Sequence, residues 1–235
     1  MVTLNPQEKI EELNEHGLKI IQAVDHYRFS IDSILLVNFI QLKNYEKVID
    51  LGTGSGIIPL LLYPKKKGLS IFGIELQEKL ADMAQRSVEL NNLENSITIL
   101  SEDLKKARNI FKSGYFDVVV SNPPYISLGQ GKINPLDSRA IARHEIKCNL
   151  EDIISTSSYL LKNKGRIYLI YKSSKLNQLI LTLKKYNIEP KVIQFIHSNI
   201  NEPACLVLLA GIKGGRAELK INPPLFLYNS NQENL

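Results

Sequence analysis

Four consecutive residues near the middle of the chain, Asn122-Pro123-Pro124-Tyr125, could hold a flat group that carries an amine. They follow the apolar run 116–120, which places them at the end of a predicted buried strand. The prolines fix φ and stiffen the backbone, so an amide, carbonyl oxygens and an aromatic ring would form a rigid platform. A stiff loop without a chemical role could carry the same residues, so the rest of the chain has to decide.

The platform suits methyl transfer to the exocyclic amine of a nucleobase, a poor nucleophile because its lone pair is delocalised into the ring. The Asn122 side-chain oxygen and the Pro123 carbonyl could accept the hydrogens of the amine and favour a localised lone pair as the nitrogen attacks. Tyr125 would stack on the base, a contact worth about 1–3 kcal/mol in nucleic-acid binders. Pro124 completes the substrate platform. This scheme requires no general base.

A glycine-rich loop lies upstream, at residues 50–56, between a predicted strand and a predicted helix. Glycines there allow a tight turn and a close approach to a ligand. A dinucleotide fingerprint needs glycine at the first, third and sixth positions. In this chain Gly52, Gly54 and Gly56 take the first, third and fifth positions, and Ile57 takes the sixth. The spacing disfavours NAD and is similar to the loop of class I S-adenosylmethionine-dependent methyltransferases.

Two acidic residues follow the next two predicted strands. Glu75 comes nineteen positions after Gly56, close to the offset at which a carboxylate accepts ribose hydroxyls. Asp103 follows the third strand, where a carboxylate can accept a hydrogen bond from the adenine amino group of a cofactor. Either residue alone is more often a solvated strand end. Together with the glycine loop and residues 122–125, they predict a pocket for a methyl donor.

Bulk composition sets broad limits on the function. The chain has 235 residues, of which 44% are apolar and 23% charged, as expected for a globular protein. It contains no apolar run of membrane-spanning length, its N-terminus does not resemble a signal peptide, and its two cysteines lie far apart. We therefore expect a cytoplasmic protein without a membrane or metal partner. A net charge of +5 is compatible with a polyanionic partner but proves little.

Short apolar runs alternate with helical patterns, which predicts an α/β fold with a Rossmann-like sheet. We expect seven mostly parallel strands with helices on both faces. The predicted strands are 47–51, 70–76, 97–100, 116–120, 166–171, 191–196 and 204–210. Asn149 is the predicted cap of a helix that extends to Leu161.

The flanks do not follow this alternation. Residues 46–214 form the predicted core of what is effectively one domain, preceded by residues 1–45, in which Ser30 could cap a helix over 31–40. Residues 215–235 are predicted to form a hairpin and a loose end. A second Asn-Pro-Pro, at 222–224, lacks the aromatic residue and is interpreted as structural.

With these residues in place, the chain resembles the bacterial methyltransferases that modify N6 of the adenosine just 3′ of the anticodon in a valine tRNA. The likeness covers nearly the whole chain. It is carried by residues 27–34, 122–125, 140–145 and 202–204, the last leading to 213–215.

The resemblance implies S-adenosylmethionine as cofactor, S-adenosylhomocysteine as product, tRNA as partner, and a monomer or homodimer. It implies that the segment around Phe29 and Asp32 packs over the cofactor. The implied cofactor residues are Arg28, Ser30, Asp32, Asp50, Gly52, Gly54, Gly56, Glu75, Asp103 and Asn122. Asn122 and Tyr125 would contact the target base.

Several charged residues near these motifs have open roles. Arg139 and Arg143 are four positions apart, so on a helix they would share one face, which either contacts RNA phosphate or is solvated. His144 has no second histidine at ligand spacing, which disfavours a metal site. The lysines at 65–67, where the chain departs from the family pattern, are predicted to form a solvated turn.

Other functions remain as alternatives. A release-factor glutamine methyltransferase also needs an amine-holding platform, but it has a long N-terminal helical bundle for which the segment before Lys47 is too short. A DNA adenine methyltransferase would need a recognition domain, and only thirty-nine residues separate Tyr125 from Gly165. A guanine N2 methyltransferase of ribosomal RNA is a closer rival, usually with a duplicated domain. A non-catalytic RNA-binding or cofactor-sensing module on the same fold would not need residues 122–125.

Overall fold

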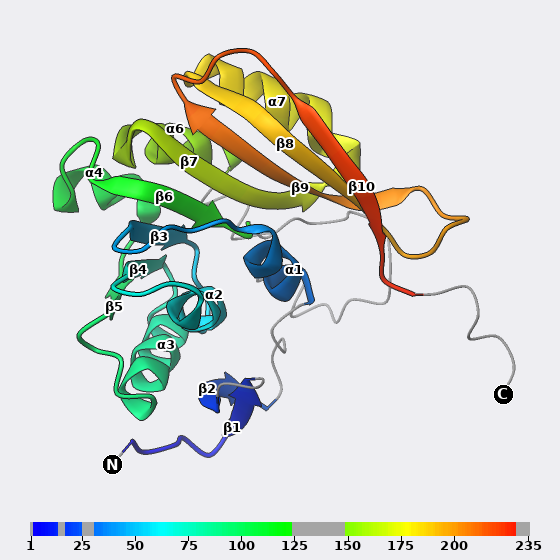
Figure 1. The fold of residues 1–235 in the computed structure, drawn as a ribbon. Coiled ribbons are helices and arrows are strands. Elements are labelled where there is room, and N and C mark those ends of the chain that lie inside the picture. Colours follow the sequence, from blue (N-terminus) through cyan, green and yellow to red (C-terminus); the bar gives the residue numbers. More distant parts are fainter. Residues whose placement is uncertain (1, 14–16, 25–30, 124–148, 229–235) are drawn as a thin grey trace, which may run out of the picture.

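A mostly parallel sheet of eight strands forms the centre of the protein, with the order β10-β8-β9-β7-β6-β3-β4-β5 (Figure 1). The structure is a computed structural model and describes residues 2–13, 17–24, 31–123 and 149–228. The strands of the sheet are β3 (Lys47–Leu51), β4 (Ser70–Glu75), β5 (Ile97–Ser101), β6 (Phe116–Ser121), β7 (Leu161–Lys172), β8 (Ile188–His197), β9 (Ala204–Lys213) and β10 (Lys220–Phe226). Within this described sheet β9 alone is antiparallel to its neighbours.

The sheet divides at its middle into two halves. The early half contains β3 to β6 and comes from residues 31–123, whereas the late half contains β7 to β10 and comes from residues 149–228. In the early half β3 pairs with both β4 and β6, so the strand order reverses at β3. Such a reversal opens a crevice at the carboxyl ends of the strands, where ligands bind in open α/β sheets.

Helices cover both faces of the sheet, as the sequence predicted. One face packs against α1 (Ile31–Phe39), α2 (Ile57–Leu62) and α3 (Glu78–Leu90), and the other packs against α4 (Ala107–Ile110), α6 (Leu150–Leu160) and α7 (Leu176–Lys185). Successive strand residues point to opposite faces. Val118 and Val120 accordingly belong to the first core, and Val119 belongs to the second.

The predicted start of α6 is confirmed in detail. The Asn149 side chain accepts a hydrogen bond from the Asp152 amide at 2.9 Å, and the Asp152 carboxylate accepts one from the Asn149 amide at 3.1 Å. These reciprocal bonds satisfy two amides that the first helical turn leaves without partners. The residues expected to face inward, Leu150, Ile153, Ile154 and Ser157, are buried.

The prediction for the C-terminal flank was wrong in two respects. Among the described residues the sheet has eight strands rather than seven, and the extra strand, β10, pairs in parallel with β8 instead of forming a hairpin. Pro223 and Pro224 obscured this strand, because proline cannot donate to a ladder and is confined to edges and bulges. Both conditions hold here, since β10 is an edge strand and its register shifts between Asn222 and Leu225.

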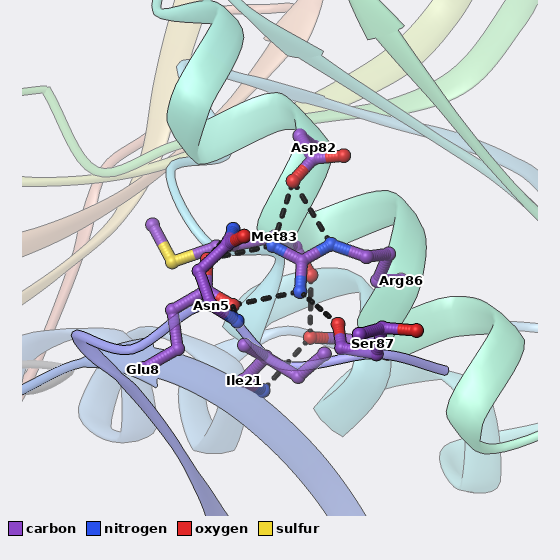
Figure 2. A network of polar contacts seen from close by, with 8 residues as sticks. Asn5, Glu8, Ile21, Asp82, Met83, Arg86 and Ser87 are labelled. Atoms are coloured by element: carbon purple, nitrogen blue, oxygen red, sulfur yellow. Dashed lines mark hydrogen bonds and ion pairs between the residues drawn. The ribbon is translucent and has the colours of Figure 1, made fainter. Parts of the chain in front are cut away.

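The N-terminal flank contains a hairpin that the sequence did not predict. Strands β1 (Glu8–Leu13) and β2 (Leu18–Ala23) pair with each other, and β2 packs on α3. Ile20 and Ile21 of β2 are fully buried. The Ile21 amide donates to Ser87 Oγ at 2.9 Å, and this hydroxyl donates to the Met83 carbonyl (Figure 2).

An ion-pair network fixes the outer side of this hairpin to α3. The Arg86 guanidinium donates to both carboxylate oxygens of Glu8 at 2.7 Å, and it also binds Asp82 (Figure 2). The bidentate bond to Arg86, despite the opposing effect of burial, lowers the pKa of Glu8 to about 2. This shift marks a specific contact between the flank and the core.

The lysine-rich turn at 65–67 is only partly solvated. Lys65 is half-buried and its ammonium donates to the Val37 carbonyl near the end of α1, so the prediction was wrong for this residue. Burial lowers the pKa of Lys65. None of the helices in the described ranges combines the length and apolar character needed to cross a membrane.

Candidate active site

The glycine loop turns the chain from β3 into α2 by means of three left-handed residues. Gly52, Gly54 and Gly56 have φ angles of 81°, 58° and 87°, a region that L side chains rarely adopt. An added Cβ at Gly56 would lie 3.0 Å from the Ala84 side chain, so this glycine permits close packing on α3. A Cβ at Gly52 or Gly54 would meet no atom within 4 Å. The loop therefore bends around open space, as a cradle for a ligand would.

Glu75 connects this loop to the end of β4. Its carboxylate accepts hydrogen bonds from the amides of Gly54 and Gln77, each at 2.9 Å. The side chain is thus held beside the cradle, at the strand end where the sequence placed it. Because β3 and β4 are parallel neighbours, Glu75 and the loop occupy the same edge of the sheet.

Asp103 lies beyond the next strand on the same edge. The Glu102 amide donates to the Glu75 carbonyl at 2.9 Å, which joins the ends of β4 and β5. The Asp103 carboxylate caps a short 3₁₀ turn by accepting a hydrogen bond from the Lys105 amide at 2.9 Å. The structure therefore brings together the glycine loop and both carboxylates that the sequence singled out.

Asp50 lies beneath the loop rather than on its surface. Its carboxylate is fully buried, and neither its oxygens nor the Thr53 hydroxyl has a hydrogen-bond partner among the described residues. Burial raises the pKa of Asp50 from 3.8 to about 7; the nearby Thr53 hydroxyl opposes this rise and the charge of Glu75 adds to it. A buried acid without a partner favours a cationic group close to the loop.

The platform residue Asn122 lies at the end of β6, on the other side of β3. Its amide nitrogen donates to Ser33 Oγ at 3.1 Å. Ser33 belongs to the first turn of α1 and is only 5% exposed. The preceding Ser121 donates to the Leu51 carbonyl at 2.7 Å, which ties the end of β6 to the strand that carries the loop. Asn122 and the cradle are therefore held across one pair of neighbouring strands.

Ser33 is a site residue that the sequence analysis did not identify. It lies in the segment 27–34 that carries the resemblance, but a serine in a helix gives no sign of a partner eighty-nine positions away. The sequence analysis also did not identify Thr53, whose buried hydroxyl is next to Asp50.

Other predicted residues are only partly located. Asp32 lies next to Ser33 in the first turn of α1 and is half-buried, and Pro123 is buried directly after Asn122. The remaining predicted residues lie outside the described residues: Arg28, Ser30, Pro124, Tyr125, Arg139, Arg143 and His144. Across the described ranges, no group of three or more His, Cys, Asp or Glu residues could hold a metal ion.

Comparison with known sequences identifies related proteins. The model of the methyltransferase small domain family matches residues 25–189. A tRNA1(Val) (adenine(37)-N6)-methyltransferase from Aeromonas hydrophila is 26% identical over 191 residues, which cover 79% of this chain and 78% of the relative. A protein of the same name from Porphyromonas gingivalis is 31% identical over 145 residues, which cover 61% of this chain and 56% of the relative.

Solved structures share the fold. A predicted O-methyltransferase from Agrobacterium tumefaciens superimposes with a TM-score of 0.69 at 24% identity, covering 86% of this chain and 90% of that protein. A 16S rRNA N2 G1207 methyltransferase from T. thermophilus, solved with AdoMet and guanosine, has a TM-score of 0.62 at 16% identity. The match covers 88% of this chain and 50% of that protein.

Proposed function

The chain belongs to the methyltransferase small domain family, and from this premise we propose that it transfers a methyl group from S-adenosylmethionine to N6 of an adenine in tRNA. The proposed target is the adenosine just 3′ of the anticodon in a valine tRNA, the position named for its relatives. The observation that carries the proposal is the Asn122 amide, held by Ser33 across from the glycine cradle.

The residues of the cradle fit the proposed cofactor. The open space beside Gly52 and Gly54 allows a ligand to approach the backbone of the loop closely. Glu75 and Asp103 place carboxylate oxygens where ribose hydroxyls and an adenine amino group can donate to them. The buried Asp50 lies below the loop without a hydrogen-bond partner among the described residues, and a bound ligand that carries an ammonium and a sulfonium would favour its charged form.

The contact between Ser33 and Asn122 orients the amide. Because the Asn122 nitrogen donates to Ser33 Oγ, the side-chain oxygen is directed away from Ser33. In the proposed complex this oxygen and the Pro123 carbonyl accept the two hydrogens of the target amine. These acceptors strengthen their bonds as the nitrogen gains positive charge during attack, so they stabilise the transition state more than the ground state.

The remaining requirement is that the methyl donor and the target amine are aligned. The bound cofactor supplies a methyl group that its sulfonium already activates as an electrophile. The end of β6 holds the site for the acceptor base, and the ends of β3 and β4 hold the pocket for the methyl donor. Because β3 is hydrogen-bonded to both β4 and β6, the two sites keep a fixed position relative to each other. In the proposal, Tyr125 stacks on the base and Arg28, Ser30 and Asp32 border the cofactor, as the family resemblance implies. A tRNA substrate also implies that the reaction takes place in the cytoplasm.

One experiment tests the reaction and its target. The purified protein is incubated with methyl-labelled S-adenosylmethionine and total tRNA, and the labelled nucleoside is identified after digestion. N6-methyladenosine at one position of a valine tRNA is the expected product. Label in N2-methylguanosine, or in protein after release factor is added, would contradict the proposed acceptor. Cofactor binding without transfer to any acceptor would indicate a sensing module instead.

A further inference from the structure

The late half of the sheet ends in a row of polar and aromatic groups on the same edge of the sheet as the candidate active site. The Ser173 hydroxyl, just after β7, donates to the Ala204 carbonyl at the start of β9. Ala204 pairs with His197, the last residue of β8. His197 pairs in turn with Phe226, the last residue of β10. The chain then continues beside β8, because the amides of Leu227 and Tyr228 donate to the carbonyls of His197 and Ser198.

Four side chains on this row could bind a polynucleotide, and we call them the late edge: Lys175, His197, Phe226 and Tyr228. Lys175 is exposed, and Phe226 and Tyr228 are 41% and 70% exposed. The His197 and Phe226 rings are tilted against each other with centroids 5.4 Å apart. The Glu202 carbonyl accepts a hydrogen bond from His197 Nδ1 at 2.8 Å, so Nε2 is an acceptor in the neutral ring.

Charge distinguishes this half from the other. Residues 149–228 contain eleven Lys and Arg against five Asp and Glu, a net charge of +6, whereas residues 31–123 contain eleven of each. The carboxyl ends of β3, β4 and β5 also present Glu75 and Asp103, which would repel phosphates. Most Lys and Arg residues of the late half lie toward the amino ends of β7, β8 and β10, as Lys162, Lys213 and Lys220 do. Lys172 and Lys175, however, lie at the carboxyl end of β7. These two lysines make the carboxyl edge of the late half more favourable for phosphates than the edge that presents Glu75 and Asp103, so an RNA whose adenosine lies at Asn122 is favoured to extend over it. Glu202 reduces the positive charge of the late edge, so aromatic stacking has to supply part of the affinity.

The distance from β6 to β10 is compatible with an RNA strand that extends over the late half. Four strand steps separate β6 from β10 in the sheet order, which at about 4.8 Å per step places Phe226 about 19 Å from the end of β6. A stacked strand rises by about 3.4 Å per nucleotide, so the late edge lies within about six nucleotides of the target.

We propose that the late edge binds the tRNA nucleotides that flank the target adenosine. Lys175 contacts a phosphate, and Phe226 and Tyr228 stack on unpaired bases with His197 supporting Phe226. This inference rests on the proposed function, because it takes Asn122 as the place of the target base.

The test uses two altered proteins and two matched controls in the full chain. Lys175→Glu reverses the charge of the late edge, and the double change Phe226→Ala and Tyr228→Ala removes both rings. Lys220→Glu and Ile221→Ala are the controls, since both residues are exposed on β10 but lie at its opposite end. Thermal unfolding checks that all four proteins are folded.

We expect the KM for tRNA to be about tenfold higher in each of the two altered late-edge proteins than in the unaltered protein, with kcat changed less than about twofold. Lys175→Glu also lowers the slope of log affinity against log salt, measured by filter binding, by about one. Transfer to a trinucleotide centred on the target adenosine stays normal, because it is too short to reach β10. The controls change tRNA binding less than about twofold.

Three results would overturn the inference. The first is an unchanged KM for tRNA in the late-edge proteins. The second is a loss of tRNA affinity in the controls equal to that in the late-edge proteins, and the third is an equal loss with the trinucleotide. Failure of the proposed function is a separate outcome. In that case the unaltered protein methylates no RNA, while the filter-binding comparison still decides whether the late edge contacts tRNA.

Discussion

The two halves of the sheet contain four strands each among the described residues but differ in strand direction and in the chemistry of their carboxyl edge. The early half is entirely parallel, is balanced in charge, and ends in a glycine loop and carboxylates tied to backbone amides. The late half contains an antiparallel strand, has a net charge of +6, and ends in aromatic rings and an exposed lysine. Asn122 lies at the boundary, at the end of β6.

In the reaction that we propose, each half serves one substrate. Carboxylates suit a ligand with hydroxyl, amino and cationic groups, and they disfavour phosphates. Cationic and aromatic groups suit RNA. A reaction between these two substrates has to take place where the halves meet, which is where the Asn122 amide is held. Four changes would break or sharpen this comparison.

The largest expected effect comes from the boundary itself. Asn122→Ala removes an acceptor of the target amine, and we expect kcat to fall at least about 100-fold. Cofactor affinity, measured by isothermal titration calorimetry, should stay within about twofold. Normal turnover would show that the amide is not part of the reaction, and a matching loss of cofactor affinity would show that Asn122 acts mainly by binding the cofactor.

The second largest effect should come from a change in the cofactor pocket of the early half. Glu75→Ala removes a carboxylate that holds the glycine loop, and we expect cofactor affinity to fall about tenfold to a hundredfold, because hydrogen bonds to charged groups contribute about 1.5–3 kcal/mol. Binding of tRNA, measured by filter binding, should not change. The control is Glu94→Gln, which alters an exposed carboxylate beyond α3. Unchanged cofactor affinity in Glu75→Ala would contradict the assignment of this pocket.

A smaller effect should come from the residue that positions the amide. Ser33→Ala removes the hydrogen bond that the Asn122 nitrogen donates to Ser33 Oγ, and the loss of about 1 kcal/mol predicts a fall in kcat of about fivefold. The KM values for cofactor and tRNA should change little, because Ser33 would act only through Asn122. In the Asn122→Ala background the same change should have no further effect. An additive loss would mean that Ser33 has another role.

The smallest effect concerns the stability of the protein without its cofactor. The folded-state pKa of Asp50, about 7, is above its ordinary value of 3.8, so the folded protein binds the proton more tightly than the unfolded chain does. The stability linked to this proton is present below about pH 4 and is lost as the pH rises to about 7. Asp50→Asn should therefore raise Tm at pH 8, by about 2–4 °C for each 1 kcal/mol of destabilisation that the buried charge causes, and by less at pH 5. A larger gain at pH 5 would contradict the burial of a charged group at this position.

Much of the early half could be predicted from the sequence because its signals are local. A strand, a glycine loop and a helix follow one another within residues 47–62, and each needs only its own residues to form. Gly52, Gly54 and Gly56 were predicted because a positive φ limits the choice of residue at the position itself. Glu75 was predicted because a parallel strand brings a fixed offset back to the same edge.

The late half and the flanks were harder to predict because their signals depend on distant partners. β10 was missed because its prolines are acceptable only at a sheet edge, and the sequence does not show which strand is outermost. The β1–β2 hairpin was missed because its residues become buried only against α3, where Ser87 and Arg86 meet them.

The sequence by itself determined the methyltransferase-like core and its glycine loop, and it predicts an amine platform at residues 122–125, since these depend on backbone geometry and spacing along the chain. Only the tertiary structure decided which groups meet across long separations. It brought Ser33 to Asn122, buried Asp50 without a partner, and aligned β7 to β10 into a basic half that ends in aromatic rings. The physical reason is that a hydrogen bond or a buried charge depends on which atoms are adjacent in space, whereas a sequence motif specifies only which residues are adjacent along the chain.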